Sequence, residues 1–319
     1  MDALLRPDSH GLLRRTVLLT LGFTGGEIDR MLRTGALEAV RRGVYRLTED
    51  GARRRPETEH ALRGRAAGSG LAPDAAFGFV TAAALLRLPS WGVPLQRLHV
   101  IRARPNGARV RGDLQIHSGR LPDDDVLVVD GLRVTSPART AVDLARTVPA
   151  NRALVTLDGA LHRAVVREQT GTPDPGAATP ADIARVVARA SGSPGAAAAR
   201  RVLALADGLS ESPGETLSRF RMHVAGLPAP VTQWPVPGTR HRTEFAWPDL
   251  GVVGEFDGRV KYGRSLRPGV DLTEVLWEEK RREDLIRATG RTVVRWIWPD
   301  IDDPGDDGMV ARLQLTLGA

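Results

Sequence analysis

Three carboxylates in the C-terminal third of the sequence are spaced so that they can converge on one point. Glu255 and Asp257 stand two residues apart in the segment 252–257, so a β-strand there places both side chains on one face, about 7 Å apart. Glu244 lies in the preceding strand-like segment, 242–247, and reaches the same place if the two strands pair antiparallel. Converging carboxylates hold a hard cation such as Mg²⁺ or Mn²⁺ that can meet a phosphate. The pattern predicts metal-dependent hydrolysis of a phosphodiester bond.

Three further side chains could assist this reaction. Glu215 falls in the first turn of a predicted helix, 213–224, where the helix dipole favours a carboxylate. Lys261 and Lys280 are the only lysines in a chain that has 45 Lys and Arg residues. A lysine can lose its proton and activate water, whereas an arginine stays protonated. We expect Lys280, on the predicted helix 272–289, to be the base rather than Lys261, which follows a turn signal.

The same features also have plainer interpretations. The segment Glu255-Phe256-Asp257-Gly258 can be a surface strand that ends in an Asp-Gly turn. The charged run 278–284 can be a solvated helix face held by i,i+4 pairs, which is the more common meaning of such a run. These alternatives predict no catalysis.

The elements that must carry these residues follow the order helix, three strands, helix, strand. Periodicity and turn residues predict helices at 213–224 and 272–289 and strands at 231–236, 242–247, 252–257 and 292–298. The order resembles the PD-(D/E)xK nuclease core, and in particular the small domains related to very-short-patch repair endonucleases. The residues that carry the resemblance are Ser212-Pro213-Gly214-Glu215, Thr243-Glu244-Phe245, Val253-Gly254-Glu255-Phe256-Asp257-Gly258, Glu279-Lys280-Arg281-Arg282-Glu283-Asp284 and Gly290 with Val293-Val294-Arg295-Trp296.

The resemblance implies a Mg²⁺-dependent DNA endonuclease. Its metal ligands would be Glu244, Glu255 and Asp257, with Glu215 and one lysine assisting. The sequence departs from the family pattern at two positions, because Glu244 stands where Asp is usual and Asp257 stands where the motif has Lys. The second departure can mean an inactive site.

The first 50 residues predict a winged helix-turn-helix. A helix at about 9–20 precedes Thr24 and Glu27, whose spacing is that of a capping box, so a second helix begins there and ends at Gly35. Strands at 37–40 and 44–47 then flank a basic turn. We expect phosphate contacts from five arginines on the second helix and the hairpin, namely Arg30, Arg33, Arg41, Arg42 and Arg46.

The segment 11–47, which ends in Arg41-Arg42-Gly43-Val44-Tyr45, resembles the N-terminal domain of AbiEi-type antitoxins. The alternative is a small helical lid with solvated arginines. Between 59 and 166 four helices alternate with four short strands, and Asp130-Gly131 predicts a hairpin turn. The segment 134–145 is similar to the one that follows the wing domain in the same antitoxin-like proteins. We expect the scattered histidines of this region to be structural or surface residues rather than metal ligands, namely His60, His99, His117 and His162.

The whole chain of 319 residues therefore predicts an α+β and α/β multidomain protein. The expected parts are a winged helix at 1–52, a mixed α/β module at 53–170, a helical linker at 171–210 and the nuclease-like αβββαβ domain at 211–319. The absence of cysteine and of any apolar run of membrane-spanning length predicts a cytoplasmic protein that does not enter a membrane.

The formal net charge of +7 suits double-stranded DNA as the partner. The basic excess lies in the first two thirds, since residues 206–319 carry 15 basic and 18 acidic side chains. The first function we weigh is the Mg²⁺-dependent DNA endonuclease. The alternative is a non-enzymatic AbiEi-type antitoxin and transcriptional regulator whose nuclease fold is degenerate, with a homodimer and a cognate toxin as further partners.

Overall fold

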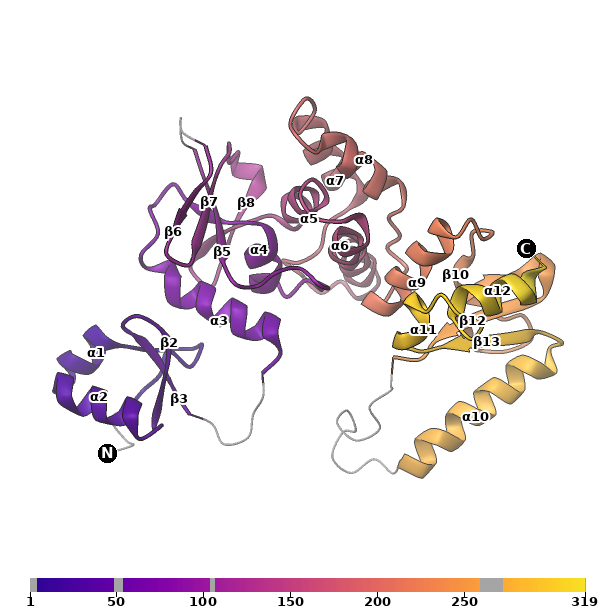
Figure 1. Ribbon diagram of the computed structural model, residues 1–319, viewed down its shortest axis with the longest axis horizontal. Helices are drawn as coiled ribbons and strands as arrows, with labels where there is room; N and C mark the ends of the chain where they lie inside the picture. Colours follow the sequence, from indigo (N-terminus) through magenta and orange to yellow (C-terminus); the bar gives the residue numbers. More distant parts are fainter. Residues whose placement is uncertain (1–4, 49–53, 104–106, 259–271, 319) are drawn as a thin grey trace. The chain divides into compact units, whose positions relative to one another are not determined.

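The computed structural model describes residues 5–48, 54–103, 107–258 and 272–318. The chain divides into two compact units, one of residues 1–148 and 181–196 and the other of residues 149–180 and 197–319. Figure 1 labels helices and strands of both units. The chain is a mixed α/β protein, as the sequence predicts. The helix that begins at Ala150 packs into the second unit, where Val155 joins its hydrophobic core.

The N-terminal part of the first unit contains the helices and hairpin that the sequence predicts. Its elements are β1 (Leu13–Arg14), α1 (Arg15–Thr20), α2 (Gly25–Arg33), β2 (Leu37–Arg41) and β3 (Val44–Leu47), and the strands form an antiparallel sheet of order β1-β3-β2. Thr24 and Glu27 form the predicted capping box of α2. The first helix begins at Arg15 rather than near residue 9, because Leu13 and Arg14 pair with β3.

The rest of the first unit is built on a six-stranded sheet of order β6-β7-β5-β4-β9-β8. The strands are β4 (Ala76–Phe77), β5 (Leu98–Arg102), β6 (Arg109–Arg111), β7 (Leu114–Ser118), β8 (Val126–Val129) and β9 (Leu132–Thr135). The helices are α3 (Pro56–Gly68), α4 (Phe79–Leu85), α5 (Pro137–Ala145) and α7 (Pro180–Arg189), and the short turn η2 (Asp123–Asp125) precedes β8.

One local prediction for this unit, the turn at Asp130-Gly131, is confirmed, and the start of α5 has a local cap. Asp130 and Gly131, between β8 and β9, have φ angles of 52° and 74°, which is the backbone of a type I′ hairpin turn. Ser136 caps α5 by accepting the N–H of Arg139, and Pro137 takes the first helical position.

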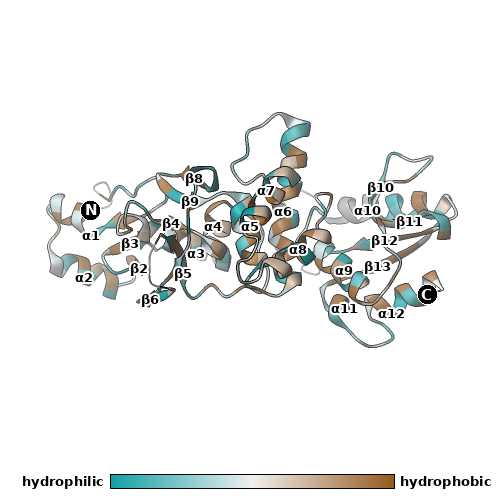
Figure 2. Ribbon diagram, turned by 90° about the horizontal axis from the view of Figure 1, so that it is seen from above, coloured by the Kyte–Doolittle hydropathy of each residue, from teal (hydrophilic) through white to brown (hydrophobic). Residues whose placement is uncertain are grey.

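The second unit begins with α6 (Ala150–Thr170), which Figure 2 shows with apolar and polar residues along its length. It continues with α8 (Ala196–Ala204), α9 (Pro213–Val224), α10 (Leu272–Ala288), α11 (Trp298–Asp302) and α12 (Met309–Leu317). Its sheet has the order β10-β11-β12-β13, from β10 (Val231–Pro235), β11 (Arg242–Trp247), β12 (Val252–Phe256) and β13 (Thr292–Trp296). β10, β11 and β12 pair antiparallel in turn, and β12 pairs parallel to β13.

Both faces of this sheet are covered. Phe245, Trp247 and Trp296 pack with residues of α9 and α12 on one face, whereas Ala246 and Val253 pack with Ile286 of α10 on the other. Gly214 lets the start of α9 approach β12, because a Cβ there would collide with the Phe256 ring. The helix and strand order αβββαβ matches the predicted order. Within the described ranges, none of the helices combines the length and hydropathy that crossing a membrane requires.

Candidate functional site

The antiparallel pairing of β11 and β12 brings Glu244 and Glu255 together. Phe245 stands opposite Gly254, so Glu244 and Glu255 come next in the same register. The backbone N–H of Phe256 donates to Glu244 Oε2 at 2.6 Å. The prediction that these two carboxylates approach each other through antiparallel strands is confirmed.

Glu244 is a carboxyl group whose proton is held unusually tightly. Burial, followed by repulsion from the carboxylates of Glu215 and Glu255, raises its pKa to about 8, against the opposing effects of the Phe256 N–H and Arg282. An acid with this pKa is mostly protonated at neutral pH. Glu244 therefore lies among the carboxylates as a neutral group.

Glu255 is held by two arginines. Arg282 Nη2 on α10 lies 2.5 Å from Glu255 Oε1, and Arg295 Nη2 on β13 lies 2.8 Å from Oε2. The parallel register sets Arg295 directly beside Glu255, and a second ion pair, at 3.2 Å, joins Arg295 to Glu283 of α10. Glu255 is only 5% exposed, so each of its oxygens has a charged partner in a place that water barely reaches.

Glu215 forms hydrogen bonds at the N-terminus of α9. Its Oε1 accepts the hydroxyl of Ser212 at 2.7 Å, and its Oε2 accepts the N–H of Glu211 at 3.0 Å and the amide of Gln233 at 3.2 Å. Ser212 in turn accepts the N–H of Glu215. Burial raises the pKa of this carboxyl. Its oxygens thus stabilise the helix N-terminus, while its charge acts on Glu244.

The remaining predicted site residues are Asp257, Lys280 and Lys261. Strand β12 ends at Phe256, one residue earlier than predicted, so Asp257 follows the strand, partly exposed, with its N–H donating to Trp296 O at 2.8 Å. Lys280 is exposed on α10, with Nζ 5.8 Å from the Trp277 ring centroid. Lys280 and Arg282 are two residues apart, about 200° around the helix, so Arg282 turns to Glu255 and Lys280 away. Lys261 lies outside the described residues.

The carboxylates as arranged do not fit a Mg²⁺ ion. A hard cation needs carboxylate oxygens that are not already paired, but both Glu255 oxygens bind guanidinium groups and Glu244 Oε2 accepts the N–H of Phe256. No group of three or more His, Asp or Glu side chains in the described ranges is arranged to hold a metal.

The five N-terminal arginines divide into two kinds. Arg46 binds Glu38 at 2.7 Å and Glu59 at 2.5 Å, and Arg41 binds Asp113 at 2.7 Å. The other three are exposed, two on α2 and one in the β2–β3 turn, and have no ion pair to a described residue, namely Arg30, Arg33 and Arg42.

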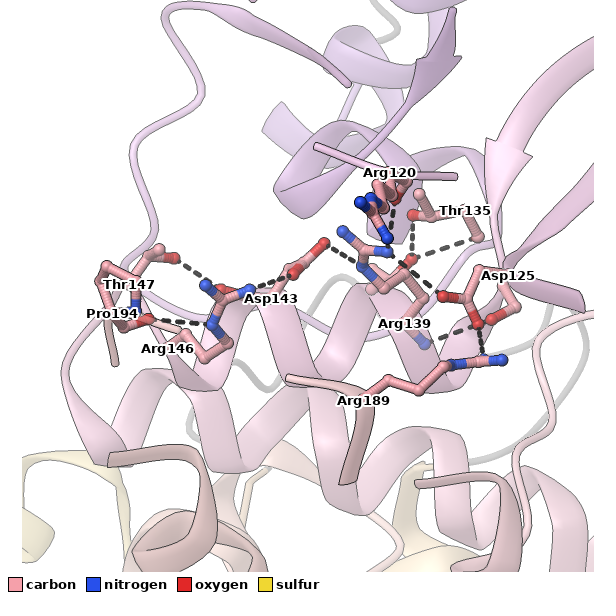
Figure 3. A network of polar contacts seen from close by, with 11 residues as sticks. Arg120, Asp125, Thr135, Arg139, Asp143, Arg146, Thr147, Arg189 and Pro194 are labelled. Atoms are coloured by element: carbon pink, nitrogen blue, oxygen red, sulfur yellow. Dashed lines mark hydrogen bonds and ion pairs between the residues drawn. The ribbon is translucent and has the colours of Figure 1, made fainter. Parts of the chain in front are cut away.

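A polar network joins η2, α5 and α7 in the first unit (Figure 3). Arg139 binds Asp143 at 2.7 Å and Asp125 at 3.2 Å, and it also donates to the carbonyl of Arg120. Arg146 makes a second ion pair to Asp143, and Arg189 of α7 makes one to Asp125. Both aspartates are almost fully buried. Each buried charge is compensated by guanidinium groups, so the network fixes these elements to one another.

The structure also brings together histidines that are scattered in the sequence. His99 Nδ1 lies 3.0 Å from His117 Nε2, and His60 contacts Thr81 Oγ1 and Leu95 O at 2.9 Å each. Burial lowers the pKa of both His60 and His99 to about 4. These rings are therefore neutral at physiological pH.

Comparison with known proteins identifies relatives of the chain. The uncharacterized protein MT2308 of Mycobacterium tuberculosis (strain CDC 1551 / Oshkosh) is 31% identical over 286 residues, which cover 88% of this chain and 93% of the relative. The uncharacterized protein Rv2248 of strain H37Rv matches to the same extent. The chain belongs to the family of these two mycobacterial proteins.

Two further matches, one to a family and one to a solved structure, cover parts of this chain. Residues 76–205 match the family described as AbiEi antitoxin C-terminal domain, and the whole Asp125–Asp143 network lies within them. The crystal structure of the RV2827C protein of Mycobacterium tuberculosis has 16% identity and a TM-score of 0.38, over 70% of this chain and 78% of that chain.

Sequence reasoning missed the arginines that surround Glu255. Arg282 lies in a charged run whose common meaning is a solvated helix face, and Arg295 lies in a predicted strand that carries part of the nuclease resemblance without a role of its own. One signal was available, since an arginine on a buried strand needs an anionic partner close by.

Proposed function

We propose that this chain is a non-enzymatic, DNA-binding regulator of the antitoxin type. The observation that carries the proposal is the match of residues 76–205 to the AbiEi antitoxin C-terminal domain. The matched stretch begins at β4 and ends just after α8, so it contains the whole six-stranded sheet and the polar network.

The N-terminal elements support DNA binding. A strand, two helices and a hairpin follow one another in the order of a winged helix, in which the second helix enters the major groove and the hairpin rests on phosphates. Arg30 and Arg33 on α2 and Arg42 in the hairpin turn are exposed. In this proposal they bind the phosphates of double-stranded DNA, whereas Arg41 and Arg46 hold the fold together through their ion pairs.

The C-terminal unit supports a role without catalysis. We interpret its αβββαβ order as a restriction-endonuclease-like fold whose site is degenerate. The arginines on Glu255 supply the positive charge that a cation would otherwise provide, and Glu244 carries a proton. Such a unit would contribute a surface for binding a partner rather than a catalytic site.

One observation favours a second candidate, a Mg²⁺- or Mn²⁺-dependent DNA endonuclease. Glu244 and Glu255 adjoin on neighbouring strands, and Glu215 is near enough to raise the pKa of Glu244. The ligands would be Glu244, Glu255 and Asp257, with Lys280 or Lys261 as the base. This candidate requires both arginines to leave Glu255.

Two measurements on the full chain test the proposal. Fluorescence anisotropy with a duplex from upstream of the chain's own gene, compared with a scrambled duplex of equal length, should show binding that prefers the upstream duplex. Supercoiled plasmid incubated with Mg²⁺ or Mn²⁺ should stay intact. Absence of binding to either duplex at low salt would overturn the regulator. Divalent-dependent nicking that Asp257→Asn and Glu244→Gln both abolish would establish the endonuclease instead.

The antitoxin part of the proposal implies a cognate toxin. The product of a gene adjacent to this one should arrest growth when expressed alone, and co-expression of this chain should relieve the arrest. Growth arrest that this chain leaves unchanged would contradict the antitoxin role while leaving DNA binding intact.

A further inference from the structure

The two outer strands of the six-stranded sheet differ in their protection. An edge strand presents backbone N–H and C=O groups that another strand can pair with, and proteins discourage this with charged side chains, proline or bulges. β6 has the sequence Arg109-Val110-Arg111, and all three residues are exposed. The charges of Arg109 and Arg111 discourage another strand from pairing with β6.

β8, at the opposite edge, has none of these protections. Its sequence is Val126-Leu127-Val128-Val129, with no charge and no proline. All four residues pair with β9 in an unbroken register, so the strand has no bulge, and Val128 is 72% exposed. Within the described residues, β9 is the only strand that pairs with β8. Such an edge leaves its outer backbone groups open to pairing with another strand.

We propose that β8 pairs antiparallel with β8 of a second copy of this chain across a two-fold axis. The pairing joins two six-stranded sheets into one. It goes beyond the regulatory function, since it concerns a surface of the first unit and does not depend on DNA.

The difference between the β6 and β8 edges favours pairing of β8 with β8 of a second copy over pairing of β8 with β6. Pairing of β8 with β6 of another copy would be head-to-tail, leave a free edge at each end and build an open chain of molecules. Arg109 and Arg111 oppose that arrangement. Pairing of β8 with β8 uses the same surface twice and closes at two copies.

The charges at the ends of β8 also favour the antiparallel pair. Asp123 and Asp124, which precede the strand, are exposed. Arg133 lies on β9 opposite Val128, on the same face of the sheet, and is exposed as well. An antiparallel pair brings the acidic end of one β8 to the other end of its partner, where Arg133 lies and where Asp130 is already ion-paired to Arg65 at 3.1 Å, once on each side of the axis.

Sedimentation velocity over a range of concentrations tests the proposal on the full chain. The wild type should be a dimer, and Val128→Lys should raise the dimer dissociation constant at least 100-fold. Val110→Lys is the matched control, because it places the same charge on the other edge at a residue that is 48% exposed, and it should leave the dimer intact. Circular dichroism should show both variants folded.

A charge exchange provides an independent check. Asp123→Arg and Arg133→Glu should each weaken the dimer about tenfold, and the double variant should recover most of the loss. A monomeric wild type at 100 µM, on the order of ordinary laboratory concentrations, would overturn the proposal. So would open-ended aggregates, or a Val110→Lys variant that dissociates as readily as Val128→Lys.

Discussion

Arg295 on β13 and Glu255 on β12 stand side by side in the parallel register of the C-terminal sheet, with 2.8 Å between Nη2 and Oε2. A guanidinium stays protonated at any physiological pH, so this compensation of the buried carboxylate is permanent. Arg282 supplies the same charge to the other oxygen. The buried carboxylate of Glu255 is therefore electrically balanced by the chain itself.

Removal of Arg295 should destabilise the second unit. Arg295→Ala leaves a buried carboxylate with one of its two charged partners, so we expect a loss of about 3 kcal/mol in the free energy of unfolding. Urea unfolding followed by tryptophan fluorescence measures it, because five of the six tryptophans lie in this unit. Arg287→Ala is the control, since it breaks an exposed pair with Glu283 and should cost less than about 1 kcal/mol. Equal losses would contradict the role of Arg295.

Glu244 should make the protein less stable as pH rises. Its pKa is about 8 in the folded state and 4.5 ordinarily, so between these values the folded state binds the proton more tightly than the unfolded state. Stability is therefore lost progressively between about pH 4.5 and 8. Glu244→Gln mimics the protonated form and should raise the unfolding temperature at pH 8.5 but not at pH 4.5. Glu168→Gln, an exposed residue of α6, should show no such dependence.

The sequence sufficed for α9, α10 and the four strands of the second unit because their signals are local, but it did not predict α11 or α12, and the strand predicted to reach 298 ends at Trp296. Strand β11 and helix α9 have the predicted bounds, since alternating burial and the Ser212 cap are readable from neighbouring residues. The antiparallel approach of Glu244 to Glu255 was also predictable from short strands joined by a turn.

The electrostatics of the site depended on contacts between distant residues. Arg282 and Arg295 lie 27 and 40 residues from Glu255, and only the helix phase and the parallel register direct them to it. The contact between His99 and His117 likewise depends on the parallel pairing of β5 with β7, which no local sequence pattern predicts.

Acid should destabilise the first unit through its buried histidines. The pKa of His60 is about 4 in the folded state and 6.5 ordinarily, so the unfolded state binds the proton more tightly. Stability is complete above about pH 6.5 and falls as pH drops towards 4. His60→Gln should reduce the loss in unfolding free energy between pH 7 and pH 5, measured by circular dichroism. His223→Gln, on the exposed side of α9, should leave that loss as it is in the wild type.

Substitution of Arg42 should affect DNA binding, and substitution of Arg46 should affect stability. The two arginines lie on one hairpin but differ in their partners. Arg42 is exposed in the turn, whereas Arg46 is held by Glu38 and Glu59. If the proposed regulator binds phosphates with the free arginines, Arg42→Ala should weaken binding to every duplex. It should also reduce the slope of log K against log salt by about 0.9, the value for one lost phosphate contact.

Arg46→Ala should keep the wild-type slope but lower the unfolding temperature, because it leaves two acidic side chains without their partner. Anisotropy titrations from 50 to 200 mM salt, on the order of the usual range, measure the slopes. A reduced slope for Arg46→Ala together with an unchanged one for Arg42→Ala would mean that the ion pairs open on DNA and that Arg46 makes the contact.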